Sequence, residues 1–226
     1  MIVLAPRYEQ NDDIHGFAMH GRDILDNARV IECIKEKVIG QLDQIGKEYG
    51  LVAGTTAKAP NYMKLHRVPV EPRTAAPRLA RQKHALLVLG REDSGMTDAE
   101  MRVCDTMITI PTSAEYPTMN VSHAAAIVLY ETWLARGPLC QDTKDPSAVS
   151  ETRGFETAPR TSRQRFYDWL TATTKHRFEG MTEPWRMENF LLCVKSVIER
   201  ATITSRELDV IEGFLKTLDQ KTPEKT

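Results

Sequence analysis

Short, largely apolar runs, each ended by a turn or a polar loop, recur along the first half of the sequence. They cover residues 2–4, 49–54, 85–89 and 106–110. Runs of this length without strict polar alternation are typical of strands that are buried on both faces of a parallel sheet. Because stretches with helical periodicity separate several of these runs, the pattern predicts an α/β fold with a parallel sheet.

Helical periodicity predicts three helices in the same half of the chain, over residues 14–34, 98–103 and 121–134. No helix or strand is predicted for the polar, Lys-rich stretch that ends at residue 48. Four prolines between residues 60 and 77 indicate irregular chain, because proline lacks a backbone N–H and resists continuation of a helix or a central strand.

The composition changes after the last of these helices. Residues 137–160 are rich in Pro, Ser, Thr and Asp without a period, which is typical of a linker. Helical patterns follow over residues 161–176 and 188–201, and a third begins where Thr204 precedes Glu207 by three positions, the spacing of a capping box. The expected organisation is an α/β domain over residues 1–136, a linker over 137–160 and a small C-terminal α-helical domain over 161–226.

Charge and composition exclude several classes of protein. The 226 residues include 30 Lys+Arg and 31 Asp+Glu, a formal net charge of −1, so the chain does not bind nucleic acid as a polycation. Its four cysteines are widely spaced and its six histidines form no ligand pattern, which predicts reduced thiols and no metal site. No apolar run reaches 18 residues and residues 1–6 do not resemble a signal peptide, so we expect a cytoplasmic protein without a membrane segment.

Three loops of small and polar residues follow three of the expected strands, at residues 55–57, 90–95 and 110–120. In open α/β sheets, ligands bind beyond the carboxyl ends of the strands, so these loops predict one shared site. The alternative is that they are ordinary turns between strands and helices. The sequence lacks the glycine-rich motifs of dinucleotide-binding folds and of P-loops, which counts against those two classes.

Two of these loops carry characteristic sequence. Residues 90–97 read Gly-Arg-Glu-Asp-Ser-Gly-Met-Thr, and Ile-Pro-Thr at 110–112 precedes Glu-Tyr-Pro-Thr-Met-Asn-Val-Ser-His-Ala at 115–124. At this spacing, both blocks closely resemble signature motifs of the SpoU branch (TrmH type) of SPOUT RNA methyltransferases. The pattern is most similar to the TrmJ group, tRNA 2′-O-ribose methyltransferases that act in the anticodon loop. Further resemblance extends over most of the chain, in residues 18–29, 52–57 and 199–208.

The resemblance implies a knotted, dimeric enzyme that uses S-adenosylmethionine. In this family, the C-terminal half of the α/β domain threads through itself as a trefoil knot, a rare exception to the absence of knots in proteins. The cofactor is bound among the three loops, and two subunits pair to complete the sites. The cofactor contacts that the resemblance implies are Thr55, Thr56, Ala57, Gly90, Ile110, Thr118 and Met119.

The same resemblance marks candidates for catalysis and for the RNA-facing side of the pocket. They are Arg91, Glu92, Asn120 and Ser122. For Glu92 the alternative is structural, since its carboxylate would also serve to tie the loop to Arg91 or to backbone N–H groups. Ser122 has a structural alternative too, because serine often caps a helix.

The family's first motif is incomplete in this chain. It reads Asn-x-Gly-x-x-x-Arg, and its Arg is held to help activate the 2′-hydroxyl. Residues 6–11 approach it and supply Asn11, an expected RNA contact, but Asp12 follows directly and no Arg matches. A helix and a strand of about 20 residues, the usual length of such a unit, are absent.

Three explanations of this departure stay open: impaired catalysis, a substitute Arg elsewhere, and a segment omitted from the sequence. An omission is favoured, because the loss of an internal strand would open the sheet. An intact mass of 25.6 kDa would exclude the omission.

RNA binding is expected to come from local charge. Residues 151–226 hold 13 Lys+Arg and 12 Asp+Glu, so this tail is only faintly basic. Basic and aromatic side chains along its first helix suit phosphates and unpaired bases. The alternative is a solvated helix face. The expected RNA contacts on this helix are Arg163, Arg165, Lys175 and Arg177.

The sequence thus predicts a homodimer that transfers a methyl group from S-adenosylmethionine to a ribose 2′-hydroxyl of tRNA. Two alternatives stay open. One is the same chemistry on ribosomal RNA, and the other is a non-catalytic RNA-binding protein that keeps the fold without the Arg.

Overall fold

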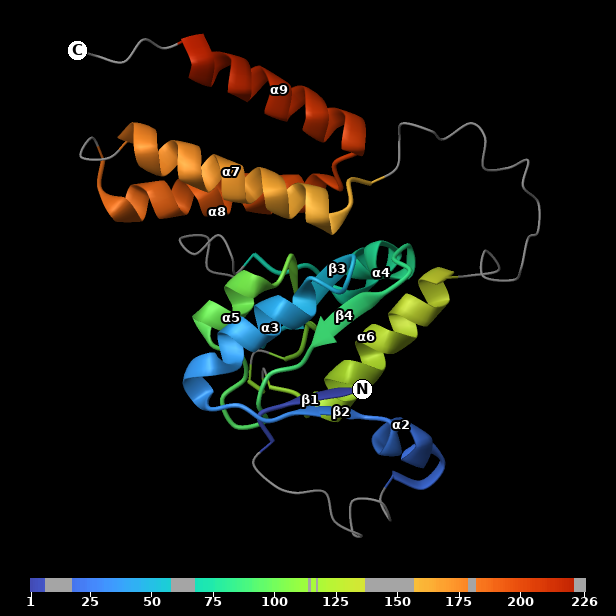
Figure 1. The fold of residues 1–226 in the computed structure, drawn as a ribbon. Helices are drawn as coiled ribbons and strands as arrows, with labels where there is room; N and C mark the ends of the chain where they lie inside the picture. The colour runs from blue at the N-terminus through green and yellow to red at the C-terminus, as the bar shows by residue number, and fades with distance from the viewer. Residues whose placement is uncertain are drawn as a thin grey trace, which may run out of the picture. The chain divides into compact units, whose positions relative to one another are not determined.

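A computed structural model describes residues 1–6, 18–57, 68–113, 115–116, 118–136, 157–178 and 182–221 (Figure 1). The chain divides into two compact units, residues 1–45 and residues 46–226. Their strands pair into two parallel sheets rather than the one sheet that the sequence predicts.

The sheet of the first unit pairs β1 (Ile2–Leu4) with β2 (Arg29–Ile31), with Val3 opposite Val30. A 3₁₀ turn (Met19–Gly21) and the short helix α2 (Arg22–Asp26) precede β2. The predicted helix over residues 14–34 is confirmed only for α2, and it is wrong for residues 29–31, which form β2. Residues 14–17 of that prediction lie outside the described part of the chain. The β-branched pair Val30 and Ile31 favours a strand once β1 supplies a hydrogen-bonding partner.

A 3₁₀ turn (Lys35–Lys37) and helix α3 (Val38–Gly46) occupy most of the Lys-rich stretch that had no expected element. Val38, Leu42 and Ile45 are buried at helical spacing. These three apolar residues were the available signal for the helix.

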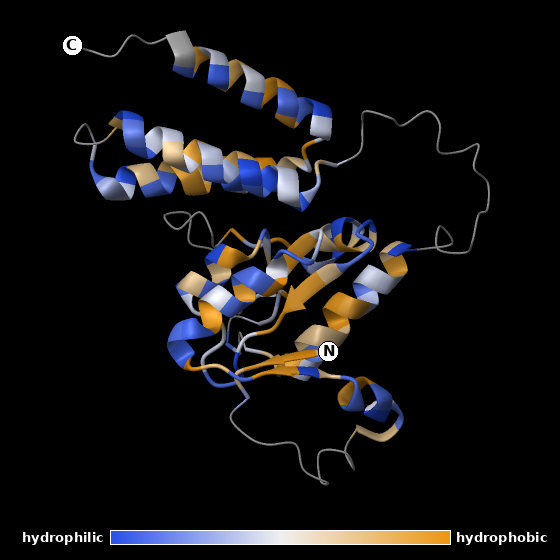
Figure 2. Ribbon diagram, in the orientation of Figure 1, coloured by the Kyte–Doolittle hydropathy of each residue, from blue (hydrophilic) through white to orange (hydrophobic). Residues whose placement is uncertain are grey.

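The sheet of the second unit has β3 (Leu51–Thr55) at its centre, between β4 (Ala85–Val88) and β5 (Thr106–Ile108). Both neighbours run parallel to β3, which confirms the three strands that the apolar runs predict. Figure 2 shows that β4 is hydrophobic along its length, as expected of a strand within such a sheet.

Helices α4 (Pro72–Ala80) and α6 (Val121–Arg136) pack against each other and share a hydrophobic core with this sheet. The prediction of irregular chain is wrong for residues 72–77. Pro72 lies in the first turn, where its missing N–H is not needed, and the helix continues through Pro77. The core is made by the buried residues Leu51, Ala53, Ala75, Leu79, Ile108 and Val128.

A second apolar cluster lies beneath α5 (Asp98–Val103), whose bounds agree with the predicted helix. The Thr97 side chain accepts a hydrogen bond from the backbone N–H of Glu100, and the Glu100 carboxylate accepts one from the N–H of Thr97. This capping box fixes the start of the helix. The cluster consists of Val52, Met96, Met101, Cys104 and Met107.

Three helices end the described chain: α7 (Arg160–Phe178), α8 (Pro184–Ala201) and α9 (Ser205–Lys221). They confirm the three helical patterns, and Thr204 and Glu207 form the predicted capping box at the start of α9. Residues 137–156 of the expected linker lie outside the described part of the chain. No helix that the structure describes is both long and apolar enough to span a membrane. The shared core of the three helices is Ala158, Phe166, Leu170, Ile198, Ile203 and Leu208.

Candidate functional site

The carboxyl ends of the three strands of the second unit lie side by side. Gly54 of β3 is paired with Val88 of β4, and Thr55 is paired with Ile108 of β5. The N–H of Thr56 donates to the carbonyl oxygen of Ile108 at 2.9 Å. The loops that begin at Thr55, Gly90 and Ile110 therefore leave one edge of the sheet together, which is where open α/β sheets bind ligands.

The second of these loops spans residues 90–96, and we name it the cofactor loop because the resemblance predicts a cofactor contact at Gly90. Arg91 and Gly95 exchange two backbone hydrogen bonds across it, with N···O distances of 3.3 and 2.8 Å. Gly95 has φ +66°, a conformation that glycine adopts without strain. A Cβ on Gly90 would lie 2.5 Å from the carbonyl carbon of Gly95 and 2.6 Å from the nitrogen of Met96. The loop therefore closes on a position that only glycine fits.

The Arg91 side chain turns to α5. Its guanidinium donates to both carboxylate oxygens of Glu100, at 2.6 and 3.0 Å. Burial opposes ionisation of Glu100, but the hydrogen bonds from Arg91 and Thr97 outweigh it and hold the pKa of this carboxyl below its usual value. The carboxylate of Glu92 is exposed and has no hydrogen-bond partner among the described residues. Arg91 is tied to Glu100, in place of the contact with Glu92 that the sequence left open.

The third loop ends in a helix cap. The side-chain oxygen of Asn120 accepts hydrogen bonds from the backbone N–H of Ser122 at 2.9 Å and from its hydroxyl at 2.7 Å. Asn120 is thus the N-cap of α6, a role that the sequence analysis gave as the structural alternative for Ser122. Thr118 is exposed and Met119 half-buried in the preceding segment, and no described contact joins either to the other two loops.

Comparisons with known proteins identify the family of the chain. Residues 5–130, more than half of the chain, match the family described as the SpoU rRNA Methylase family. The chain belongs to the SpoU methylase family. Like the family's fold, this one is α/β with parallel strands.

Two relatives of the chain are named as TrmJ tRNA 2′-O-methyltransferases. The tRNA (cytidine-2′-O-)-methyltransferase TrmJ of Methanocaldococcus jannaschii is 38% identical over 122 residues, which cover 54% of this chain and 50% of that protein. The tRNA (cytidine/uridine-2′-O-)-methyltransferase TrmJ of Klebsiella pneumoniae is 25% identical over 225 residues, 97% of this chain and 84% of that protein. The chain thus spans half the length of the first relative and most of the second.

A solved structure has the same fold. The structure of a probable methylase family protein from Haemophilus influenzae superposes with a TM-score of 0.55 at 22% identity, over 97% of this chain and 84% of that one.

The predicted RNA contacts separate into two groups. Arg165 and Lys175 are exposed on α7, and Arg177 is about one-third exposed and paired with Asp219 at 2.7 Å. Arg163 is 4% exposed, and its guanidinium donates to Glu199 at 2.9 Å. The prediction that Arg163 contacts RNA is therefore corrected, because a buried and paired guanidinium does not reach a phosphate. Asn11 lies outside the described residues.

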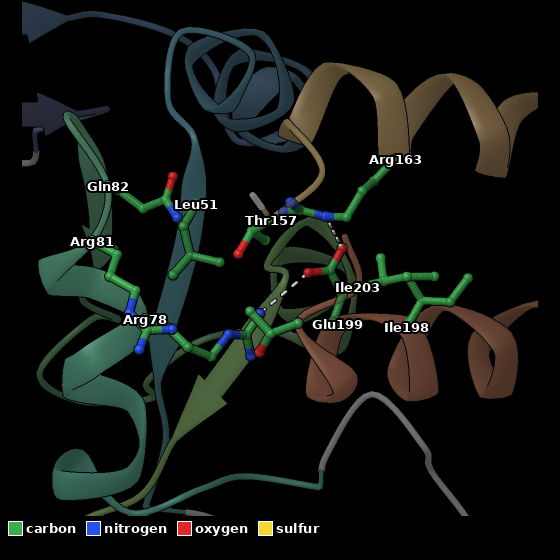
Figure 3. Close-up of a pocket in the computed structure, with 10 residues that line it drawn as sticks. Leu51, Arg78, Arg81, Gln82, Thr157, Arg163, Ile198, Glu199 and Ile203 are labelled. Carbon is green, nitrogen blue, oxygen red and sulfur yellow. Dashed lines mark hydrogen bonds and ion pairs between the residues drawn. The ribbon is translucent and has the colours of Figure 1, made fainter. Parts of the chain in front are cut away.

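The partners of Arg163 form a buried polar cluster that sequence reasoning missed. The Glu199 carboxylate accepts hydrogen bonds from Arg163, from Arg78 at 3.3 Å and from the Tyr167 hydroxyl at 3.0 Å. Figure 3 shows the carboxylate between the two guanidinium groups. We call Arg78, Arg163, Tyr167 and Glu199 the Glu199 network. Its members lie up to 121 positions apart, so no local pattern reveals it.

A second buried pair lies at the start of β5. Asp105 accepts from the Arg160 guanidinium and from the N–H of Val52, both at 2.8 Å. Arg160 also donates to the carbonyl oxygen of Gly46 at 2.9 Å. This pair and the Glu199 network tie α7 and α8 to the part of the second unit that carries the sheet.

Metal-ligating side chains do not gather in the described ranges. No group of three or more His, Cys, Asp or Glu residues there is arranged to hold a metal ion. Cys33, Cys104 and Cys193 are free thiols, and burial raises the pKa of Cys104 to about 12. Cys104 therefore stays a protonated core residue at neutral pH.

Proposed function

We propose that this protein transfers the methyl group of S-adenosylmethionine to a ribose 2′-hydroxyl of tRNA, in the anticodon loop. The observation that carries the proposal is the tight cofactor loop at the shared carboxyl edge of β3, β4 and β5. It occurs in a member of the SpoU methylase family whose relatives are named tRNA 2′-O-methyltransferases. The same relatives support a cytoplasmic location.

The residues at this edge suit S-adenosylmethionine. Gly90 presents only backbone where the loop is tightest, and backbone groups there and at Ile110 can recognise an adenine without a charged side chain. When bound, the cofactor supplies an electrophilic methyl group on its sulfonium. The chain's own task is then to hold that methyl in line with the ribose oxygen, which is chiefly positioning. The proposed contacts remain Thr55, Thr56, Ala57, Gly90, Ile110, Thr118 and Met119.

Glu92 is the residue we propose to accept the proton of the 2′-hydroxyl. Its carboxylate is exposed within the cofactor loop and has no partner within the described chain, so it is available to a substrate. Asn120 and Ser122 are proposed to shape the RNA-facing side, where the cap leaves the Asn120 amide nitrogen without a described partner. The first-motif Arg has no counterpart in this arrangement.

Arg165, Lys175 and Arg177 on α7 are the RNA contacts we propose to keep from the sequence prediction, together with Asn11. Arg165 and Lys175 are exposed, and Arg177 is partly exposed and paired with Asp219. Cations on one helix add to phosphate binding without specifying the base. We also propose the domain boundaries stated from the sequence, and a trefoil knot in the C-terminal half of the α/β domain. Family membership supports the knot.

We propose that two copies pair through α6. Leu129, Tyr130, Trp133 and Leu134 are each between 46% and 68% exposed on this helix, and the Tyr130 and Trp133 rings stack with centroids 6.3 Å apart. A cluster of large apolar side chains of this kind marks an interface.

Trp133→Asp should therefore turn a dimer into a monomer. The loss of a central aromatic residue weakens an interface by about 2 kcal/mol or more, which is about thirtyfold in Kd. Light scattering after size exclusion measures the mass. Trp185→Asp, at a similarly exposed tryptophan on α8, is the matched control and should leave the mass unchanged. Equal masses for wild type and Trp133→Asp would contradict this interface.

Mapping of 2′-O-methylation in a strain that lacks the gene tests the substrate. The proposal expects one methylated position to disappear from the anticodon loop of one or more tRNAs. A loss confined to ribosomal RNA would support the alternative substrate. An unchanged map would support the non-catalytic RNA-binding protein.

A further inference from the structure

Arg91 was a candidate for contact with the substrate, but the structure gives its guanidinium another partner. Glu100, with 6% of its surface exposed, holds both terminal nitrogens of Arg91 in a two-pronged contact. Planar guanidinium and carboxylate groups in this arrangement form the strongest and most directional ion pairs. Arg91 is therefore not a free cation at the edge of the site.

Glu100 makes a second set of contacts with the same carboxylate. Its Oε2 atom accepts from the N–H of Thr97 at 2.8 Å as well as from Arg91 at 3.0 Å. The neighbouring Met101 is 1% exposed and packs with Val52 and Met96 in the cluster beneath α5. The carboxylate is thus held by a helix start whose position is fixed by the core of the sheet.

Arg91 also spans the cofactor loop. Its backbone exchanges two hydrogen bonds with Gly95, and its guanidinium donates to the Gly95 carbonyl oxygen at 3.4 Å. Arg91 therefore joins the two sides of the loop, and its side chain joins the loop to α5 through Glu100. The loop would otherwise depend on a glycine with positive φ, whose backbone is intrinsically free.

We propose that the Arg91–Glu100 pair holds the cofactor loop in its binding conformation, so that both are positioning residues for methyl transfer. This inference rests on the proposed function of the loop. The pair contributes by reducing the ordering that binding requires, rather than by touching the substrate. The hydrogen bond to Glu100 raises the pKa of Arg91. Burial opposes ionisation of Glu100, but hydrogen bonds from Arg91 and Thr97 lower its pKa, so both side chains are charged at neutral pH.

The decisive experiment is a double-mutant cycle of Arg91→Ala and Glu100→Gln. The glutamine side chain of the second variant can still complete the capping box, because glutamine serves at that position, so α5 keeps its start. Each single variant should raise the Kd for S-adenosylmethionine by about tenfold in calorimetry, and the double variant by no more than either. Tenfold effects that multiply to a hundredfold would show that the two residues act separately and would overturn the proposal.

Steady-state kinetics separate positioning from a general loss of structure. The single variants should raise KM for S-adenosylmethionine while kcat and KM for tRNA stay near wild type, and Arg91→Lys should restore part of the affinity. Arg73→Ala, which breaks the exposed 3.2 Å pair with Glu131, is the matched control and should change neither constant. A rise in KM for tRNA alone would show that Arg91 contacts the substrate, against the proposal.

Hydrogen exchange measures whether the Arg91–Glu100 pair orders the loop, whatever the loop binds. The N–H of Gly95, bonded to the Arg91 carbonyl oxygen, should exchange at least about tenfold faster in Arg91→Ala than in wild type. Equal exchange would overturn the positioning role. If wild type does not bind S-adenosylmethionine, the proposed function fails, while the exchange result still decides whether the pair orders the loop.

Discussion

Replacing Gly90 with alanine is expected to lower the affinity for S-adenosylmethionine by about a hundredfold. The added Cβ would meet backbone atoms of Gly95 and Met96 at 2.5 and 2.6 Å, well inside contact distance, so the cofactor loop must open. Overpacking of this kind costs up to about 3 kcal/mol, which corresponds to about two factors of ten in Kd. Titration calorimetry of the purified variant measures the loss directly.

Gly213→Ala is the control for this substitution. Gly213 lies within α9, and a Cβ there meets nothing within 4 Å. Alanine inside a helix is favoured over glycine by about 0.5–1 kcal/mol, so this variant should keep the cofactor affinity and gain slight stability. If Gly90→Ala bound S-adenosylmethionine with wild-type affinity, the cofactor loop would not be part of the binding site.

Replacing Glu199 with alanine is expected to destabilise the protein by about 3–5 kcal/mol, the usual result of leaving a buried charge without its partner. Arg163 is 4% exposed and would lose its counter-ion, as would the Arg78 side chain, which is 17% exposed. The Tyr167 hydroxyl would lose its acceptor as well. Urea unfolding followed by circular dichroism measures the change in the free energy of unfolding.

Glu188→Ala offers a matched control on the same helix. Glu188 also pairs with an arginine, Arg102, but its side chain is 56% exposed. Exposed pairs contribute about 0–1 kcal/mol, so the control should change stability little. Similar losses of unfolding free energy in the two variants would show that the buried Glu199 network contributes no more to stability than an exposed ion pair. Glu199→Gln, which keeps the shape of the side chain, should fall between them.

Local patterns predicted the elements whose signals lie within one segment. The apolar run at 85–89, the capping box of Thr204 and Glu207 and the limits of α5 all depend on neighbours in sequence. Errors arose where tertiary contacts decide. Val30 and Ile31 form a strand because β1 lies beside them, and α4 forms despite Pro77 because its buried face packs in the core.

The site shows the same division. The shared edge of three loops followed from parallel strands alone, so Thr55, Gly90 and Ile110 were correctly expected to leave the sheet together. The roles of single charged residues did not follow, because a charge is visible in the sequence and its partner is not. Arg163 has its partner 36 positions away. Arg91 pairs with Glu100, nine positions on, across a turn whose shape the sequence does not reveal.

The departure in the first motif bears on activity rather than on the cofactor loop. The strands of the described residues form a two-stranded and a three-stranded sheet, and Asn11 of this motif lies outside those residues. An active enzyme with this sequence would have to activate the 2′-hydroxyl without the family's first-motif Arg.

Methyl transfer by the purified protein tests the central claim most directly. Unmodified tRNA is incubated with S-adenosylmethionine that carries a radioactive methyl group, and the RNA is then hydrolysed with alkali. A 2′-O-methyl group removes the hydroxyl that alkaline cleavage requires, so the account predicts label in alkali-resistant dinucleotides from the anticodon loop. Label in mononucleotides, or no label from a protein that binds both cofactor and tRNA, would contradict it.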